Sequence, residues 1–167
     1  MTIPKQTRIY ALLTAYSWPK RRKIDSLNDK KLSLRSKYWL KTSRKVDLNL
    51  PILKNYNKLD KYCDSQICTF INNVDNEIVI SIRGTDITRL EENDLYLDVK
   101  LLCGTLKNTD RYNKCYNILK EIIKEFSEKR IIICGGSLGG RISVDLLDSN
   151  LGKHIFEVHV FNCATSL

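Results

Sequence analysis

A short apolar run in the second half of the chain is followed directly by a cluster of glycines around one serine. Residues 131–134 are Ile, Ile, Ile and Cys, and residues 135–140 continue as Gly-Gly-Ser-Leu-Gly-Gly. An apolar run too short for a helix is typical of a strand buried on both faces, and such strands belong to parallel sheets covered by helices. Because helical spacing of apolar residues resumes over 138–147, the sequence predicts a parallel strand, a tight turn and a helix.

The neighbouring segments extend this pattern in both directions. Two β-rich runs, residues 66–72 and 77–83, flank a turn-forming Asn-Val-Asp-Asn and predict a hairpin. Apolar residues repeat at helical intervals over 112–126, and residues 156–161 are typical of another strand. The order strand, helix, strand, helix, strand predicts an α/β fold with a mostly parallel sheet covered by helices.

The N-terminal part of the chain differs from the rest in charge. The first 50 residues hold 13 Lys and Arg against three acidic residues, whereas the remainder holds 15 against 16. Residues 9–18 predict a short helix ended by Pro19, and residues 20–62 predict an irregular basic stretch with short helices. We therefore expect two parts: a basic helical or irregular region at 1–60 and an α/β core at 61–167.

This basic region suggests several partners. Residues 20–23 are Lys-Arg-Arg-Lys, and such a cluster binds an anionic membrane surface, an acidic protein or nucleic acid, or simply forms a solvated surface. No apolar run reaches the roughly 20 residues of a membrane span, and the N-terminus lacks a secretory signal, so we expect a cytoplasmic protein without a transmembrane segment. Abundant Lys, Asn and Ile suggest an AT-rich genome, such as that of a large DNA virus or a parasite, and in a virus the protein would be virion-associated.

Cysteine and histidine patterns give no sign of a metal or a cofactor. The six cysteines lack zinc-knuckle spacing, and in a chain of 167 residues we expect them to be reduced core residues. The two histidines, His154 and His159, are five residues apart in a predicted strand and would point to opposite faces.

The glycine cluster fits a catalytic pattern. Gly135, Ser137 and Gly139 match G-x-S-x-G, the nucleophile elbow, in which a sharp turn lifts a serine oxygen above the sheet. The small residues let strand and helix approach closely, and the helix N-terminus stabilises a developing oxyanion. A plain glycine-rich turn or a phosphate-binding loop remains an alternative.

A second motif lies upstream. The strand over 80–83 continues into Gly84 and Thr85 as Arg-Gly-Thr. With both motifs in this order, residues 60–167 resemble the class 3 (fungal-type) lipases, which have the α/β-hydrolase fold. The resemblance implies that Ser137 is the nucleophile, that Leu138 and Thr85 supply oxyanion N–H groups, that residues 86–96 occupy the lid position, and that residues 94–98 match the family's Asp segment.

The chain also departs from that family. Gly136 replaces the usual His before the serine, and Ile82 replaces a common aromatic residue. The family's catalytic Asp and His follow later strands and have no counterpart here, since Asp145, Asp148 and the two histidines fall elsewhere. Three explanations remain: a longer natural chain truncated after the strand that follows the elbow, a degenerate hydrolase fold kept for structural or binding purposes, or a histidine recruited from elsewhere, including another chain.

Two functions follow from these observations. The first is a serine hydrolase that cleaves carboxylic ester bonds of lipids through Ser137, as a triacylglycerol lipase or a phospholipase does. The second is a catalytically inactive lipase-fold protein with a structural or interaction role, for instance in a viral assembly. It would bind an anionic partner through its basic region and a protein partner at an open sheet edge.

Overall fold

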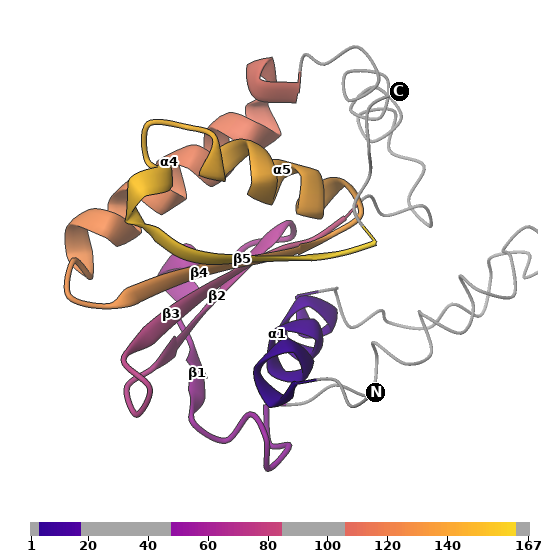
Figure 1. The fold of residues 1–167 in the computed structure, drawn as a ribbon, viewed down its shortest axis with the longest axis vertical. Coiled ribbons are helices and arrows are strands. Elements are labelled where there is room, and N and C mark those ends of the chain that lie inside the picture. Colours follow the sequence, from indigo (N-terminus) through magenta and orange to yellow (C-terminus); the bar gives the residue numbers. More distant parts are fainter. Residues whose placement is uncertain (1–3, 18–47, 85–105, 163–167) are drawn as a thin grey trace, which may run out of the picture.

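The computed structural model describes residues 4–17, 48–84 and 106–162, which form one sheet with helices on both faces (Figure 1). The elements in chain order are α1 (Lys5–Tyr16), β1 (Tyr56–Lys58), η2 (Asp60–Tyr62), β2 (Ile67–Asn72), β3 (Glu77–Ile82), η3 (Leu106–Asn108), α4 (Asp110–Glu125), β4 (Arg130–Gly136), α5 (Leu138–Leu147), η4 (Gly152–His154) and β5 (Ile155–Phe161).

The five strands form a mixed sheet in the order β1-β2-β3-β4-β5. The pairs β1–β2 and β2–β3 are antiparallel, whereas β3–β4 and β4–β5 are parallel. The predicted hairpin and the predicted succession of strand, helix, strand, helix, strand are thus confirmed in β2 to β5. The prediction of a mostly parallel sheet is wrong, because half of the pairings are antiparallel.

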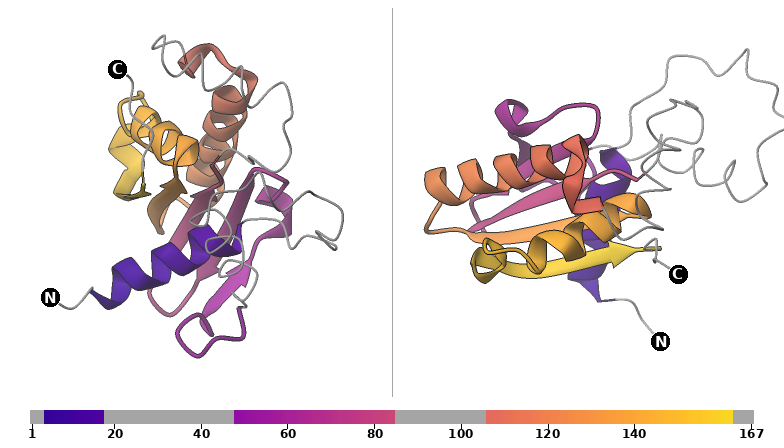
Figure 2. Two further views of the ribbon diagram at one scale, coloured as in Figure 1. Left: turned by 90° about the vertical axis from the view of Figure 1, so that its right-hand side faces the viewer. Right: turned by 90° about the horizontal axis from the view of Figure 1, so that it is seen from above.

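Each face of the sheet carries its own apolar core. Helices α4 and α5 cover one face, where residues such as Ile80 and Ile133 meet Leu119 and Ile142. Helix α1 covers the other face, where Leu13 is fully buried. The two views of Figure 2 show the same layers, with α1 on the face opposite α4 and α5. The apolar runs of β3 and β4 are nearly continuous because β3 and most of β4 are buried on both faces.

A buried carboxylate ties α1 and β1 to the central strands. Glu77, at the start of β3, is fully buried and accepts hydrogen bonds from the Tyr10 and Tyr56 hydroxyls and from Arg130 Nη2, the last at 3.2 Å. Burial, followed by the neighbouring carboxylate, raises the pKa of both tyrosines above the usual value near 10. Such a charge is tolerated in a core only because several donors surround it.

Several predictions fall on residues outside the described ranges. They concern most of the basic stretch, the lid segment 86–96 and the Asp segment 94–98, and they remain predictions. Helix α1, from the predicted N-terminal region, packs on the sheet. The predicted division of the chain into two parts near residue 60 also remains a prediction. Among the described residues, no helix combines the length and apolar composition needed to cross a membrane.

Candidate functional site: a serine on a strand-to-helix turn

Ser137 occupies a sharp turn between β4 and α5. Strand β4 ends at Gly136 and α5 begins at Leu138, so Ser137 alone joins the two elements. Its backbone has φ 51° and ψ −123°, a conformation that residues with a Cβ rarely adopt. A backbone held there costs of order 1–3 kcal/mol and is found most often at functional sites. The side chain is half-buried and does not cap α5.

The glycines two residues before and two residues after Ser137 are required by close backbone contacts. A Cβ atom on Gly135 would lie 2.3 Å from the Gly139 carbonyl oxygen, and one on Gly139 would lie 2.2 Å from the Ile82 carbonyl oxygen. Neither distance is compatible with a side chain. The glycine positions of the G-x-S-x-G pattern therefore allow α5 to pack directly against the ends of β3 and β4.

The end of β3 also lies against the serine. A Cβ atom on Gly84 would be 2.7 Å from the Gly136 carbonyl oxygen and 3.0 Å from Ser137 Cβ. Gly84, the glycine of the Arg-Gly-Thr motif, therefore lies directly against Ser137. Thr85, the predicted oxyanion residue, is the next residue in the chain and lies outside the described ranges.

Arg111 holds this end of β3 in place. It lies in the first turn of α4, is 4% exposed, and donates from Nη2 to the carbonyl oxygens of Arg83 and Gly84, the latter at 3.4 Å. On the other side, the Arg83 N–H donates to the Gln66 carbonyl at 2.9 Å. The sequence patterns did not predict Arg111 as a residue of the site. The signal available was an arginine beside the apolar positions of a predicted amphipathic helix.

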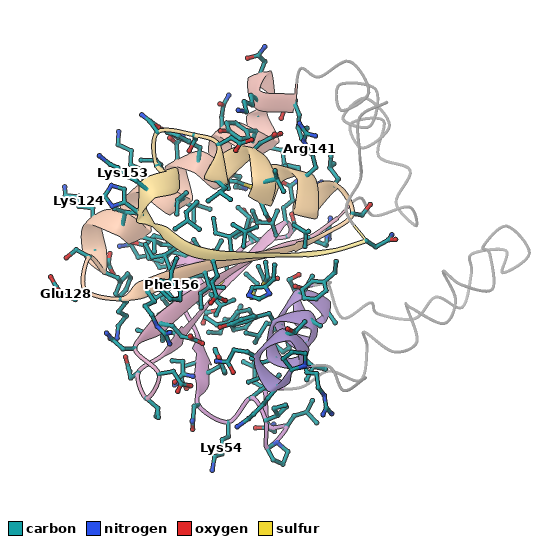
Figure 3. All side chains as sticks on the ribbon, in the orientation of Figure 1. Lys54, Lys124, Glu128, Arg141, Lys153 and Phe156 are labelled. Carbon is teal, nitrogen blue, oxygen red and sulfur yellow. The ribbon has the colours of Figure 1, made fainter. Side chains whose placement is uncertain are left out.

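The N-terminus of α5 supplies the polar surroundings of the serine. Leu138 is fully buried, and as the first helical residue its N–H group has no intrahelical acceptor. The helix dipole adds a partial positive charge at this end. Arg141, one turn further on, forms an ion pair with the buried Asp145 at 3.1 Å. Figure 3 shows Arg141 on α5, away from Phe156 at the start of β5.

Within the described ranges, neither histidine is hydrogen-bonded to Ser137. His154 is in η4, before β5, and because β5 runs parallel to β4 this is the opposite end of the sheet from Ser137. His159 lies within β5, with its ring centroid 4.5 Å from that of Tyr10 and its Nε2 atom 2.8 Å from Glu157 Oε2. His154 lies outside the strand in which it was predicted.

The arrangement can present a serine hydroxyl beside a helix N-terminus and the end of β3. Within the described part of the chain, no group of three His, Cys, Asp or Glu residues is arranged to hold a metal ion. Comparisons of this chain with protein-family models, with curated proteins and with solved structures find no match.

Proposed function

We propose that the chain is a class 3 lipase-like α/β-hydrolase, and that it cleaves carboxylic ester bonds of lipids through Ser137. One observation carries the proposal. Ser137 has a positive φ between a parallel strand and a helix, with glycines two residues before and after it that cannot carry a Cβ. This is the geometry that a nucleophile elbow requires.

The proposed reaction is acyl transfer in two steps. A base takes the Ser137 hydroxyl proton while the oxygen attacks the ester carbonyl carbon, and the developing oxyanion accepts hydrogen bonds from the Leu138 and Thr85 N–H groups. The alcohol leaves with the proton, and water then hydrolyses the acyl-serine. We assign the base to a histidine of a second copy of this chain, which the purified protein supplies, because neither His154 nor His159 is hydrogen-bonded to Ser137 within one chain.

Ester turnover tests the proposal. The purified chain should hydrolyse p-nitrophenyl butyrate, and Ser137→Ala should lower kcat/KM by about 10³-fold or more, as removal of a nucleophile does. Ser127→Ala, which changes an exposed serine, is the matched control and should keep full activity. Turnover that Ser137→Ala leaves intact, or no turnover by the folded chain, would contradict the proposal.

The positions of the histidines favour a second function, a catalytically inactive hydrolase-like protein that binds an anionic partner. A serine without a base is a poor nucleophile. The fold would then serve as a scaffold for the basic stretch, whose Lys and Arg residues each add about 1 kcal/mol near an anionic lipid surface.

Charge reversal tests the second function. Replacing residues 20–23 by Glu should abolish co-sedimentation with vesicles containing phosphatidylserine, and binding by the unmodified chain should weaken as salt is added. The control reverses four exposed lysines on the described surface, three of them labelled in Figure 3: Lys54, Lys120, Lys124 and Lys153. Equal losses in both variants would show that net charge alone matters.

A further inference from the structure

Two thiols lie in contact at the start of β2, far along the chain from Ser137. Cys63 follows η2 and is half-buried, whereas Cys68 lies in β2 and is 5% exposed. Their sulfur atoms are 3.6 Å apart. Both are free thiols, and a disulfide would need the sulfurs to approach to about 2.05 Å.

The local backbone holds this pair together. Asp64 Oδ1 accepts hydrogen bonds from the N–H groups of Gln66 and Ile67 at 2.5 and 2.9 Å, which folds the intervening residues into a tight turn. The Asp64 N–H also donates to the Ile67 carbonyl at 2.8 Å. The turn returns the chain on itself, and the two cysteines at its ends are brought side by side.

The surroundings of Cys63 stabilise its thiolate. The Thr69 N–H donates to Cys63 Sγ at 3.2 Å, and the Lys58 ammonium group adds a positive charge nearby. The hydrogen bond between the two thiols is the largest cause that lowers the pKa of Cys63 below its usual value. Cys63 therefore loses its proton more readily than an ordinary thiol, and the thiolate is the reactive form.

The other described cysteines show the contrast. Cys115 and Cys134 are fully buried, and burial raises the pKa of Cys115 to about 12 and that of Cys134 to about 11. They serve as internal references for an inert core thiol.

We propose that Cys63 and Cys68 form a peroxide-reactive thiol pair that closes to a disulfide. The Cys63 thiolate attacks one oxygen of a hydroperoxide, which gives a sulfenic acid and releases water or an alcohol. The Cys68 thiol then attacks the sulfenic sulfur and releases water. Two thiols are oxidised by two electrons and the peroxide is reduced by two, so the step balances with the hydroperoxide as the oxidant.

Peptide mapping tests this proposal directly, because trypsin releases both cysteines in one peptide, residues 62–83. The folded full-length chain is treated with a few equivalents of hydrogen peroxide, alkylated with iodoacetamide and digested without reductant. We expect the 62–83 peptide to be unalkylated and about 2 Da lighter than its reduced form, for the two hydrogens lost. The peptides that contain Cys115 and Cys134 should be alkylated after unfolding.

Single substitutions test the order of the steps. Cys68→Ser should leave Cys63 as a sulfenic acid that dimedone traps, and Cys63→Ser should leave Cys68 unoxidised. In the unmodified folded chain, iodoacetamide should modify Cys63 at least about tenfold faster than Cys115 or Cys134, and urea should remove this difference. A fully alkylated 62–83 peptide after peroxide treatment of the folded, unsubstituted chain would overturn the proposal, whatever the variants do.

Discussion

At the residue scale, three of the glycines around the serine turn have no space for a side chain. Gly135, Gly139 and Gly84 each face a backbone atom closer than any Cβ could tolerate, whereas Gly136 does not. A Cβ on Gly136 would lie 3.6 Å from both Thr14 Cγ2 and the Phe161 carbonyl oxygen, which is ordinary van der Waals contact. Alanine substitutions of Gly139 and Gly136 therefore compare a position without space for a Cβ with one that has space.

Gly139→Ala should destabilise the protein by about 2–4 kcal/mol, because α5 must move away from the end of β3. Gly136→Ala should change the free energy of unfolding by less than about 1 kcal/mol. Urea unfolding followed by circular dichroism measures both. Equal effects of the two substitutions would contradict the packing described for the turn.

The protein should be less stable with serine at position 137 than with glycine there. A glycine adopts φ 51° without steric cost, so Ser137→Gly should raise the free energy of unfolding by about 1 kcal/mol. Ser137→Ala keeps the Cβ and should leave stability within about 0.5 kcal/mol, because the serine hydroxyl does not cap α5. A loss of stability in Ser137→Gly would show that the backbone there is unstrained.

At the element scale, the Glu77 cluster joins parts of the chain that sequence patterns treat separately. Tyr10 comes from α1, Tyr56 from β1 and Arg130 from β4, and all three donate to one carboxylate. Nothing local indicates this convergence, because it depends on the positions of four elements. The three-residue β1 was missed for a similar reason: Tyr-Asn-Lys carries no alternation, and only pairing with β2 makes it a strand.

Tyr56→Phe should lower the free energy of unfolding by about 1–3 kcal/mol at neutral pH, because the buried Glu77 carboxylate loses a donor. Tyr116→Phe, which removes an exposed hydroxyl bonded to Asn150 at 2.7 Å, is the control and should cost less than about 1 kcal/mol.

The same substitution should change the response to alkali. The pKa of Tyr56 is higher in the folded than in the unfolded state, so its stabilising effect is complete below about pH 10 and is lost as pH rises above that value. The unmodified protein should therefore lose stability above pH 10 more steeply than Tyr56→Phe does. Parallel pH profiles would contradict the environment described for this hydroxyl.

At the scale of the whole molecule, sequence patterns predicted the strands, helices and turns that depend on neighbouring residues. Short apolar runs, helical spacing and the G-x-S-x-G pattern predicted β4, α5, β5 and the turn at Ser137. They did not predict Arg111, which contacts the end of β3 from a helix 27 residues away in the chain, nor the contact between Cys63 and Cys68. Those contacts depend on turns and on the packing of elements far apart in the sequence.

Covalent labelling tests whether Ser137 is an activated nucleophile. The purified chain is treated with a fluorophosphonate probe, and the intact mass is measured for the unmodified protein, Ser137→Ala and Ser127→Ala. We expect one adduct per chain that Ser137→Ala abolishes and Ser127→Ala retains. A folded chain without an adduct would contradict the claim and favour an inactive fold that binds an anionic partner.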